Sequence, residues 1–168
     1  EKAHTCYEIM RKRGQLVSDN SAKLEAIAQI VKDNPNDKII IISKRGEFAA
    51  EITNYLNETF GEICGDYHDK IEPRIMTDDD GVPILYKSGS MKGQPRIAHA
   101  QAIGNRNLDF YNRGRLRVLS LKNASNTAIS ASFSIMIITS SLCDTIDEIR
   151  YRFNHLDIDS NKLVVYKL

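Results

Sequence analysis

The sequence lacks the features that mark secreted, metal-binding and membrane-spanning proteins. Its three cysteines, Cys6, Cys64 and Cys143, show no CxxC spacing, which argues against a disulfide framework and against a thiolate metal site. No apolar run approaches the length that a bilayer requires, and the N-terminus has no signal-peptide pattern. We therefore expect an intracellular protein of a reducing compartment that makes no membrane contact.

An excess of charge of one sign is also missing. The chain has 23 lysines and arginines against 22 aspartates and glutamates, so no global field attracts it to nucleic acid or to an anionic membrane. The patterns GxxxxGK(S/T) and GxGxxG are absent, and Gly89–Gly93 has neither the spacing nor the strand-to-helix context of a phosphate cradle. The sequence therefore supports neither a self-sufficient P-loop NTPase nor a standard dinucleotide fold, and any contact with nucleic acid must be local.

The pattern that is present alternates helices with buried strands. At 168 residues and 42% hydrophobic content, the chain has the size of one domain with a sizeable core. Apolar residues at helical spacing predict helices that end at Asn34 and at Phe60, and helices over Ile97–Asn112, with a candidate break at Gly104, and Asp144–Phe153. Continuous apolar runs predict buried strands at Lys38–Ser43 and Ile135–Thr139, and further strands are expected at Glu62–Asp66, Leu116–Leu121 and Leu163–Tyr166. This alternation predicts an α/β fold, with a mostly parallel sheet and helices on both faces.

Residues 69–95 interrupt the alternation. Asp78–Gly81 is a strong turn signal between Ile75–Met76 and Pro83–Tyr86, which predicts a surface hairpin inserted into the domain. Because no further oxygen ligands follow the aspartates at EF-hand spacing, we interpret them as turn residues and predict no metal site. The following Ser88–Gly93 is typical of a mobile loop.

Several segments resemble motifs of the second RecA-like domain of superfamily 2 helicases. Ile39–Arg45 is similar to motif IV, in which a strand delivers a polar or basic segment to the nucleic-acid track. Upstream, Ser21–Glu25 resembles the Ser-x-Lys-Leu segment that opens this domain, and Gly65–His68 resembles the loop after the next strand, where a Gly-His pair often lies. Phe110–Leu119 is similar to the family pattern of an aromatic residue, two further residues, a glycine and a strand reading Leu-Arg-Val-Leu, with Tyr111 in the usual place of phenylalanine.

Motif V of the family is only partly matched. In the family this segment offers Thr or Ser to the nucleic-acid backbone, and a Gly with a following acidic or amide residue near the nucleotide. Leu121–Ser130 lies in its place but has Asn126 and Ala128 there, which is a departure from the pattern. The resemblance leaves Asn126 as the expected nucleotide contact.

Glu148–His155 lies where motif VI of the family, of the form QxxGRxxR, would fall, and matches it only in part. Arg152 falls on the arginine-finger position, whereas Glu148, Tyr151 and His155 replace the family's Gln, Gly and last Arg. An arginine finger works because a fixed guanidinium neutralises the charge that develops on the transferring phosphoryl group. The loss of one of two such arginines should weaken catalysis severely.

The resemblance implies that residues 18–168 are the C-terminal lobe of an ATP-dependent helicase or translocase. Residues 1–17 would then be a linker or the end of a preceding segment, and the start at Glu1 rather than Met favours a fragment or a mature product. ATP and Mg²⁺ are the implied cofactors, bound mainly by an N-terminal RecA-like lobe of the same parent protein. The other implied partner is nucleic acid, with DNA favoured over RNA.

The site residues that the resemblance implies form two groups. Arg152, with Arg150 beside it, would reach the shared ATP site as an arginine finger, although a solvated helix face is the simpler explanation of adjacent arginines. For the nucleic acid, binding outside the carboxyl ends of parallel strands favours residues that follow those strands. The candidate nucleic-acid contacts are Ser43, Lys44, Arg45, His68, Lys122 and Asn123.

Two other interpretations stay open at this point. The departures in motifs V and VI fit a catalytically inactive RecA-like scaffold that docks a partner, and an unrelated flavodoxin-like or Rossmann-like binding domain would make the resemblance accidental. An active lobe would be a divergent helicase of viral or mobile-element type. Its expected location is the cytoplasm or nucleoid, or the viral replication site if the protein is viral.

Overall fold

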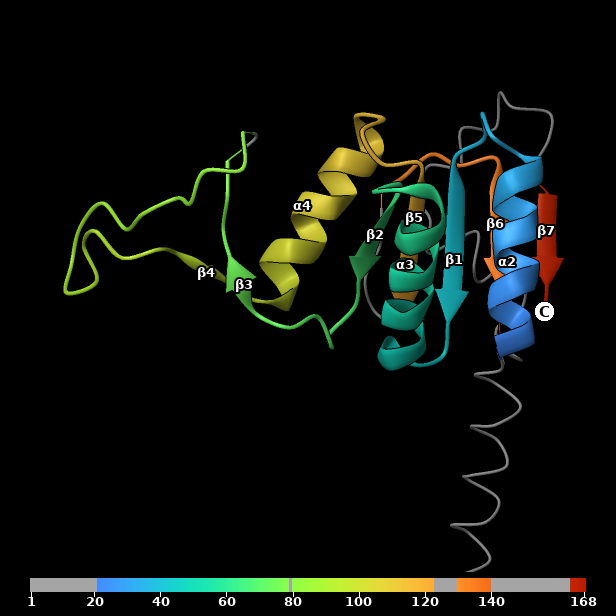
Figure 1. Cartoon of the computed structure of the whole chain (residues 1–168), viewed down its shortest axis with the longest axis horizontal. Coiled ribbons are helices and arrows are strands. Elements are labelled where there is room, and N and C mark those ends of the chain that lie inside the picture. Colours follow the sequence, from blue (N-terminus) through green and yellow to red (C-terminus); the bar gives the residue numbers. More distant parts are fainter. Residues whose placement is uncertain (1–20, 79, 123–129, 140–163) are drawn as a thin grey trace, which may run out of the picture.

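A five-stranded parallel sheet forms the body of the protein. The computed structural model describes residues 21–78, 80–122, 130–139 and 164–168 (Figure 1). The strand order is β2-β5-β1-β6-β7, and every neighbouring pair is parallel. The strands are β1 (Ile39–Ser43), β2 (Cys64–Tyr67), β5 (Val118–Lys122), β6 (Ile135–Ile138) and β7 (Val164–Lys167). This sheet confirms the predicted α/β class.

The central strand is β1, as its sequence requires. Its four consecutive isoleucines are buried, and β5 and β6 flank it on either side. Because successive side chains point to opposite faces of a sheet, Ile39 and Ile41 enter one hydrophobic cluster, while Ile40 and Ile42 enter another. A strand that is apolar on both sides belongs in a sheet whose two faces are both covered by other elements.

Helices α2 (Ser21–Asp33) and α3 (Gly46–Phe60) cover one face of the sheet (Figure 1). Each helix buries the apolar residues whose helical spacing predicted it. Ile27 and Val31 of α2 and Ile52 of α3 are fully buried. The helix α2 stops before Pro35, which cannot continue it. The helix α3 stops at Gly61, whose φ of 81° lies in the region that glycine adopts without strain.

Helix α4 (Ala100–Asn112) lies against the opposite face, where Tyr111 is fully buried. It begins three residues later than the sequence predicts, because Ile97–Ala98 pairs with another strand instead. It also passes through Gly104 without the predicted break. A Cβ on Gly104 would lie only 3.2 Å from the ring of Tyr67, so this glycine serves the close approach of α4 to β2.

Residues 69–98 form an extension that projects from the β2 edge of the body, beyond α4 (Figure 1). Its strands β3 (Arg74–Ile75) and β4 (Ile97–Ala98) pair antiparallel. Three segments close on one another through backbone hydrogen bonds: the N–H of Met76 donates to Arg96 O, that of Arg96 to Ile84 O, and that of Ile84 to Met76 O, each at 2.8 Å. The region predicted as a hairpin therefore contains a third segment that the pattern did not reveal.

The remaining predictions concern the loop at Ser88–Gly93 and two segments near the ends of the chain. The predicted mobile loop Ser88–Gly93 contains hydrogen-bonded turns, in which Lys92 N–H donates to Gly89 O and Gln94 N–H donates to Met91 O. The predicted helix Asp144–Phe153 and the predicted linker 1–17 lie outside the described residues. Among the helices that are described, none has the length and apolar character to cross a membrane.

Candidate functional site

The carboxyl ends of β1, β2 and β5 meet at one edge of the sheet. The register places Ser43 opposite Lys122 and Tyr67 opposite Leu121. The segments that follow β1 and β2 therefore start on either side of the end of β5. This edge brings together five of the predicted nucleic-acid contacts, from three separate parts of the chain: Ser43, Lys44, Arg45, His68 and Lys122.

Lys122 forms an ion pair that the sequence did not reveal. Its Nζ lies 2.9 and 3.0 Å from the two carboxylate oxygens of Asp69. The hydrogen bond from Lys122 holds the pKa of the Asp69 carboxyl below its ordinary value. Both side chains keep contact with solvent, so the pair sits at the surface of the site and is open to competition by other anions.

The loop that carries Asp69 packs against the first turn of α3. A Cβ added at Gly46 would lie 2.8 Å from Cγ of Lys70 and 3.3 Å from Oδ1 of Asp69. A glycine at the start of α3 therefore lets the two loops approach closely. The result is that Asp69 and Lys70 lie next to the segment containing Lys44.

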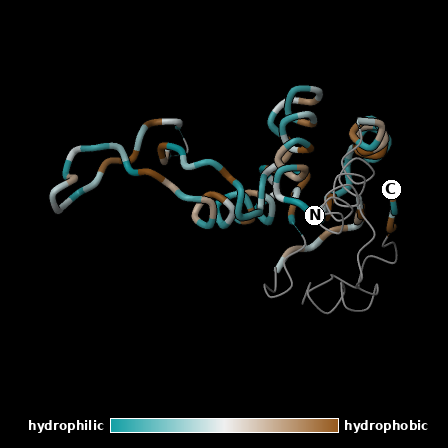
Figure 2. The backbone as a smooth tube through the Cα atoms, turned by 90° about the horizontal axis from the view of Figure 1, so that it is seen from below, coloured by the Kyte–Doolittle hydropathy of each residue, from teal (hydrophilic) through white to brown (hydrophobic). Residues whose placement is uncertain are grey.

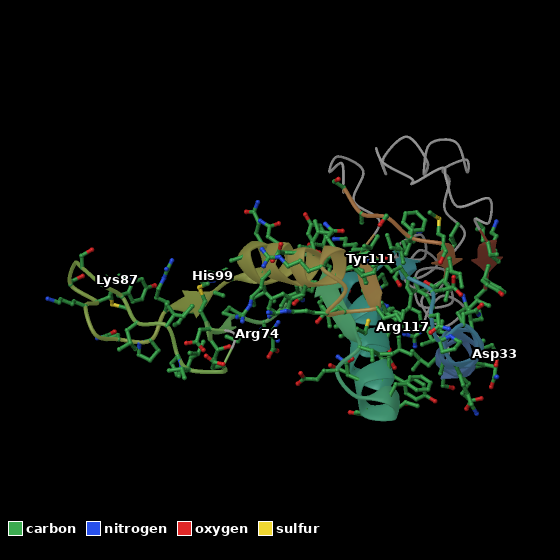
Figure 3. The ribbon with its side chains drawn as sticks, turned by 90° about the horizontal axis from the view of Figure 1, so that it is seen from above. Asp33, Arg74, Lys87, His99, Tyr111 and Arg117 are labelled. Carbon is green, nitrogen blue, oxygen red and sulfur yellow. The ribbon has the colours of Figure 1, made fainter. Side chains whose placement is uncertain are left out.

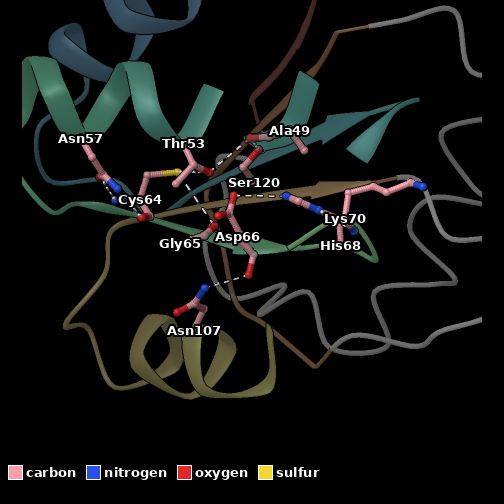
Figure 4. A network of polar contacts seen from close by, with 10 residues as sticks. All are labelled: Ala49, Thr53, Asn57, Cys64, Gly65, Asp66, His68, Lys70, Asn107 and Ser120. Atoms are coloured by element: carbon pink, nitrogen blue, oxygen red, sulfur yellow. Dashed lines mark hydrogen bonds and ion pairs between the residues drawn. The ribbon is translucent and has the colours of Figure 1, made fainter. Parts of the chain in front are cut away.

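The side chain of His68 is fully buried and contacts Asp66 and Lys70, each two residues away along the chain (Figure 4). Lys70 N–H donates to Nδ1 at 3.2 Å, so in the neutral ring the proton resides on Nε2, which lies 3.3 Å from Oδ1 of Asp66. Asn107 of α4 in turn donates to Asp66 O. These contacts give His68 a positioning role: it fixes the 68–70 loop, and its ring does not face solvent.

Ser43 is also buried, with no exposed surface. Thr139 comes directly after β6. Its hydroxyl is a hydrogen-bond donor that lies 3.2 Å from Ser43 Oγ and 3.3 Å from Ile42 O. Lys23 of α2 donates to Thr139 O at 2.6 Å and to Leu168 O at 3.3 Å. The carboxyl ends of β1, β6 and β7 are thus tied together, and Lys23 within the Ser-x-Lys-Leu segment has a clear structural role.

Lys44 and Arg45 lie at the N-terminal end of α3. Lys44 is exposed, and Arg45 contacts Glu47 at 3.7 Å in a partly exposed ion pair. The N-terminus of a helix favours anions, because its first N–H groups have no partner within the helix and the helix dipole is positive there. Two cations beside such a terminus form a local positive site in a chain whose net charge is close to zero.

Two other cations are committed to the fold. Arg117 donates to Val31 O at 3.2 Å and to Asn34 O at 2.7 Å, so it caps the C-terminal end of α2. Partial burial lowers the pKa of this guanidinium, and Asp37 nearby acts in the opposite direction. Lys38 similarly donates to Tyr111 O and Asn112 O at the end of α4. Cations at helix C-termini are stabilising for the same electrostatic reason that anions are at N-termini.

The remaining predicted site residues, Asn123, Asn126, Arg150 and Arg152, lie outside the described residues. In the described part of the chain, no group of three His, Cys, Asp or Glu side chains could hold a metal ion. The residues that sequence reasoning missed are Asp69, Thr139 and Lys23. Only the strand order brings Asp69 and Thr139 to this edge, so no local pattern could have revealed them.

The chain thus has an α/β fold, in which a parallel sheet of order β2-β5-β1-β6-β7 is covered by helices on both faces. The C-terminal domain of the Sulfolobus solfataricus SWI2/SNF2 ATPase shares this fold, with a TM-score of 0.54 and 12% sequence identity over 97% of this chain. The Pyrococcus furiosus Hef helicase domain gives a TM-score of 0.48 and 18% identity over 88% of this chain.

The chain covers 61% of the Sulfolobus chain and 25% of the Pyrococcus chain. No protein-family model and no curated protein sequence matches it. At these identities the likeness concerns the fold, and the chemistry has to be argued from the residues themselves.

Proposed function

We propose that this chain is the second RecA-like lobe of an ATP-dependent DNA or RNA helicase or translocase. The observation that carries the proposal is the carboxyl edge of the sheet, where Lys44 and Arg45 flank the N-terminus of α3 and Lys122 lies on the neighbouring strand. Phosphate groups bind to such combinations of cations and helix termini, and backbone contacts of this kind position a protein on nucleic acid without reading its sequence.

The charges on α3 support the same path for the nucleic acid. Over Gly46–Phe60 the helix has three glutamates, Glu47, Glu51 and Glu58, and no lysine or arginine; all three are exposed. A polyanion is repelled from this outer face and attracted to the cations at the start of the helix. The proposed track therefore runs over the carboxyl edge and not across the helical face.

Each residue of the edge then has a definite role. Lys44 and Arg45 contact phosphates, and Lys122 does so once a phosphate replaces Asp69, with Asn123 next to it. Ser43 and His68 act indirectly, because both are buried and hold the loops that present these cations. DNA remains the favoured nucleic acid in this proposal, as expected from the resemblance.

The nucleotide part of the proposal assigns ATP mainly to an N-terminal lobe of the parent protein. Because this chain has no P-loop pattern, the proposal places the P-loop and the acidic Mg²⁺ ligands on that lobe. Arg152, with Arg150, would complete the site as the lobes close on ATP, and Asn126 would contact the nucleotide. Closing and reopening would make the nucleic-acid contacts of the two lobes alternate.

The test is ATP hydrolysis by the full-length parent protein, with and without single- and double-stranded nucleic acid. We expect Arg152→Ala to lower nucleic-acid-stimulated turnover by about 10³-fold or more, which is the usual contribution of an arginine finger. Arg113→Ala is the matched control, because Arg113 is exposed and pairs only locally with Asp109. Full stimulated turnover in Arg152→Ala would contradict the proposed role of this arginine.

A second candidate function is an inactive RecA-like scaffold. The observation that favours it is the departure from motif VI, where Glu148, Tyr151 and His155 replace the family's residues. In that case the native parent protein shows no stimulated turnover, and Arg152→Ala leaves its binding partners unchanged. Absence of turnover in the native protein would therefore favour the scaffold over the motor.

A further inference from the structure

The extension keeps its large apolar side chains in solvent. Among the described residues, the large hydrophobic side chains that remain exposed all lie in it, with 43–57% of their surface accessible: Ile75, Val82, Leu85, Met91 and Ile97. Figure 2 shows hydrophobic segments along the extension as well as in the body. Contiguous exposed apolar surface on a soluble domain marks interaction sites, because it gains nothing for the fold.

The strand register gathers four apolar residues on one side of the extension. Ile75 pairs with Ile97, and Leu85 pairs with Pro95. Pro95 comes two residues before Ile97, the first residue of β4, and forms a β-bridge of its own, so in this extended segment their side chains point to the same face. Directly paired residues also share a face, and Ile75, Leu85, Pro95 and Ile97 therefore form one apolar strip.

This strip lies on a supported framework. The backbone hydrogen bonds among Met76, Ile84 and Arg96 close the three segments on one another. Arg106 of α4 donates to Asp78 O at 3.2 Å and lies over the ring of Phe110, 5.0 Å from its centroid, which ties the turn at Asp78 to the body. A surface that is held in shape before binding loses less conformational entropy when a partner docks.

The extension has as many acidic as basic residues, but they are unevenly distributed: residues 69–80 carry five aspartates and glutamates and two lysines and arginines. Residues 81–108 contain four lysines and arginines and not one aspartate or glutamate, in a chain that is almost neutral as a whole. Lys87, Lys92 and Arg96 are exposed within this segment. Figure 3 shows Lys87 far out on the extension, well away from Tyr111 and Arg117 in the body. A partner that complements the charge of the 81–98 part of the extension is therefore acidic.

We propose that the extension docks an acidic protein segment, which places apolar side chains on the Ile75–Leu85–Pro95–Ile97 strip and carboxylates next to Lys87, Lys92 and Arg96. The apolar strip distinguishes this partner from nucleic acid. Bases are bound by stacking on aromatic rings, whereas the four side chains of this strip are all aliphatic. The aromatic ring near it, that of Tyr86, already lies under the guanidinium of Arg96, 5.8 Å from the ring centroid.

The proposal does not depend on the helicase function, because it rests on a surface remote from the carboxyl edge. It is tested by selecting short random peptides on the full 168-residue chain. We expect the selected peptides to be rich in both carboxylates and apolar residues. Leu85→Ser combined with Ile97→Ser, and separately Lys87→Glu combined with Lys92→Glu, should each weaken their binding by about tenfold or more.

The substituted side chains are exposed, so both variants should fold as the native chain does, which circular dichroism verifies. Lys32→Glu on α2 is the matched charge control and should leave peptide binding unchanged. Peptides without the acidic and apolar character, or peptides that bind both double variants equally well, would overturn the proposal.

Two further measurements distinguish other occupants of the strip. If the double variants lose affinity for a single- or double-stranded oligonucleotide and not for the peptides, the occupant is nucleic acid. If sedimentation shows concentration-dependent association of the native chain that Leu85→Ser with Ile97→Ser abolishes, the occupant is a second copy of the chain. Either result overturns the docking of an acidic protein segment.

Discussion

The body and the extension of this protein use apolar side chains in opposite ways. In the body, the isoleucines of β1 are almost completely buried between two layers of helices and loops. In the extension, isoleucines in paired strands remain about half exposed. The same residue type thus stabilises the fold in one region and leaves surface for association in the other, because only the body has helices to cover its strands.

The two regions also differ in how their backbone groups are satisfied. The body has a parallel ladder of five strands, whose register also sets the candidate site. The extension has short strands, closed by a small cycle of hydrogen bonds and by turns at glycines, such as Gly81 and Gly93, with φ of 81° and 84°. Such turns are open to glycine without strain, so the shape of the extension is determined by its backbone more than by a core.

The largest effect is expected from shortening an isoleucine in each region. Ile41→Ala should lower the free energy of unfolding by about 2–5 kcal/mol, because it leaves a cavity at a fully buried position. Ile97→Ala should change it by less than about 0.5 kcal/mol, since its side chain is half exposed. Urea unfolding of both variants measures the difference. Equal losses would mean that the extension has a buried core of its own.

A smaller effect is expected on nucleic-acid binding, and it separates the two basic regions. If the carboxyl edge is the track, Lys44→Ala weakens binding to any sequence and lowers the slope of log affinity against log salt by about 1. The matched variant Lys87→Ala, in the extension, should leave that slope unchanged. Fluorescence anisotropy at several salt concentrations measures both. The reverse result would move the nucleic-acid contact to the extension.

The smallest effect is expected from the ion pair at the carboxyl edge. The pKa of Asp69 is lowered in the folded state, chiefly by the hydrogen bond from Lys122, so the pair stabilises the fold above the ordinary carboxyl value of 3.8. This contribution disappears as the pH falls through the lower, folded-state value. Asp69→Asn should therefore be less stable than the native chain at neutral pH, and the difference should vanish in strong acid.

Chemical denaturation across this pH range provides the measurement. High salt should reduce the difference at neutral pH, because both side chains reach solvent. A difference between native and Asp69→Asn that persists in strong acid would show that Asp69 stabilises the loop through something other than its charge. The Asp69→Asn variant should also bind nucleic acid more tightly if Lys122 is a phosphate contact, because the competing carboxylate is gone.

Much of the body was predictable from the sequence. The four isoleucines of β1 allow only a strand that is buried on both faces, and Pro35 and Gly61 mark where α2 and α3 must stop. The sequence also placed Lys44, Arg45 and Lys122 directly after or at the ends of buried strands, which is where parallel sheets present their ligand contacts.

Tertiary structure decided the rest. The sequence alone predicted the five strands of the body and the C-terminal ends of α2 and α3, because hydrophobic periodicity and helix termination act between residues that are close along the chain. The pairing of Ile97–Ala98 with β3, the burial of His68 and Ser43, and the meeting of Asp69 with Lys122 depend on residues far apart in sequence. No local pattern records such contacts, since they exist only once the strand order brings their partners together.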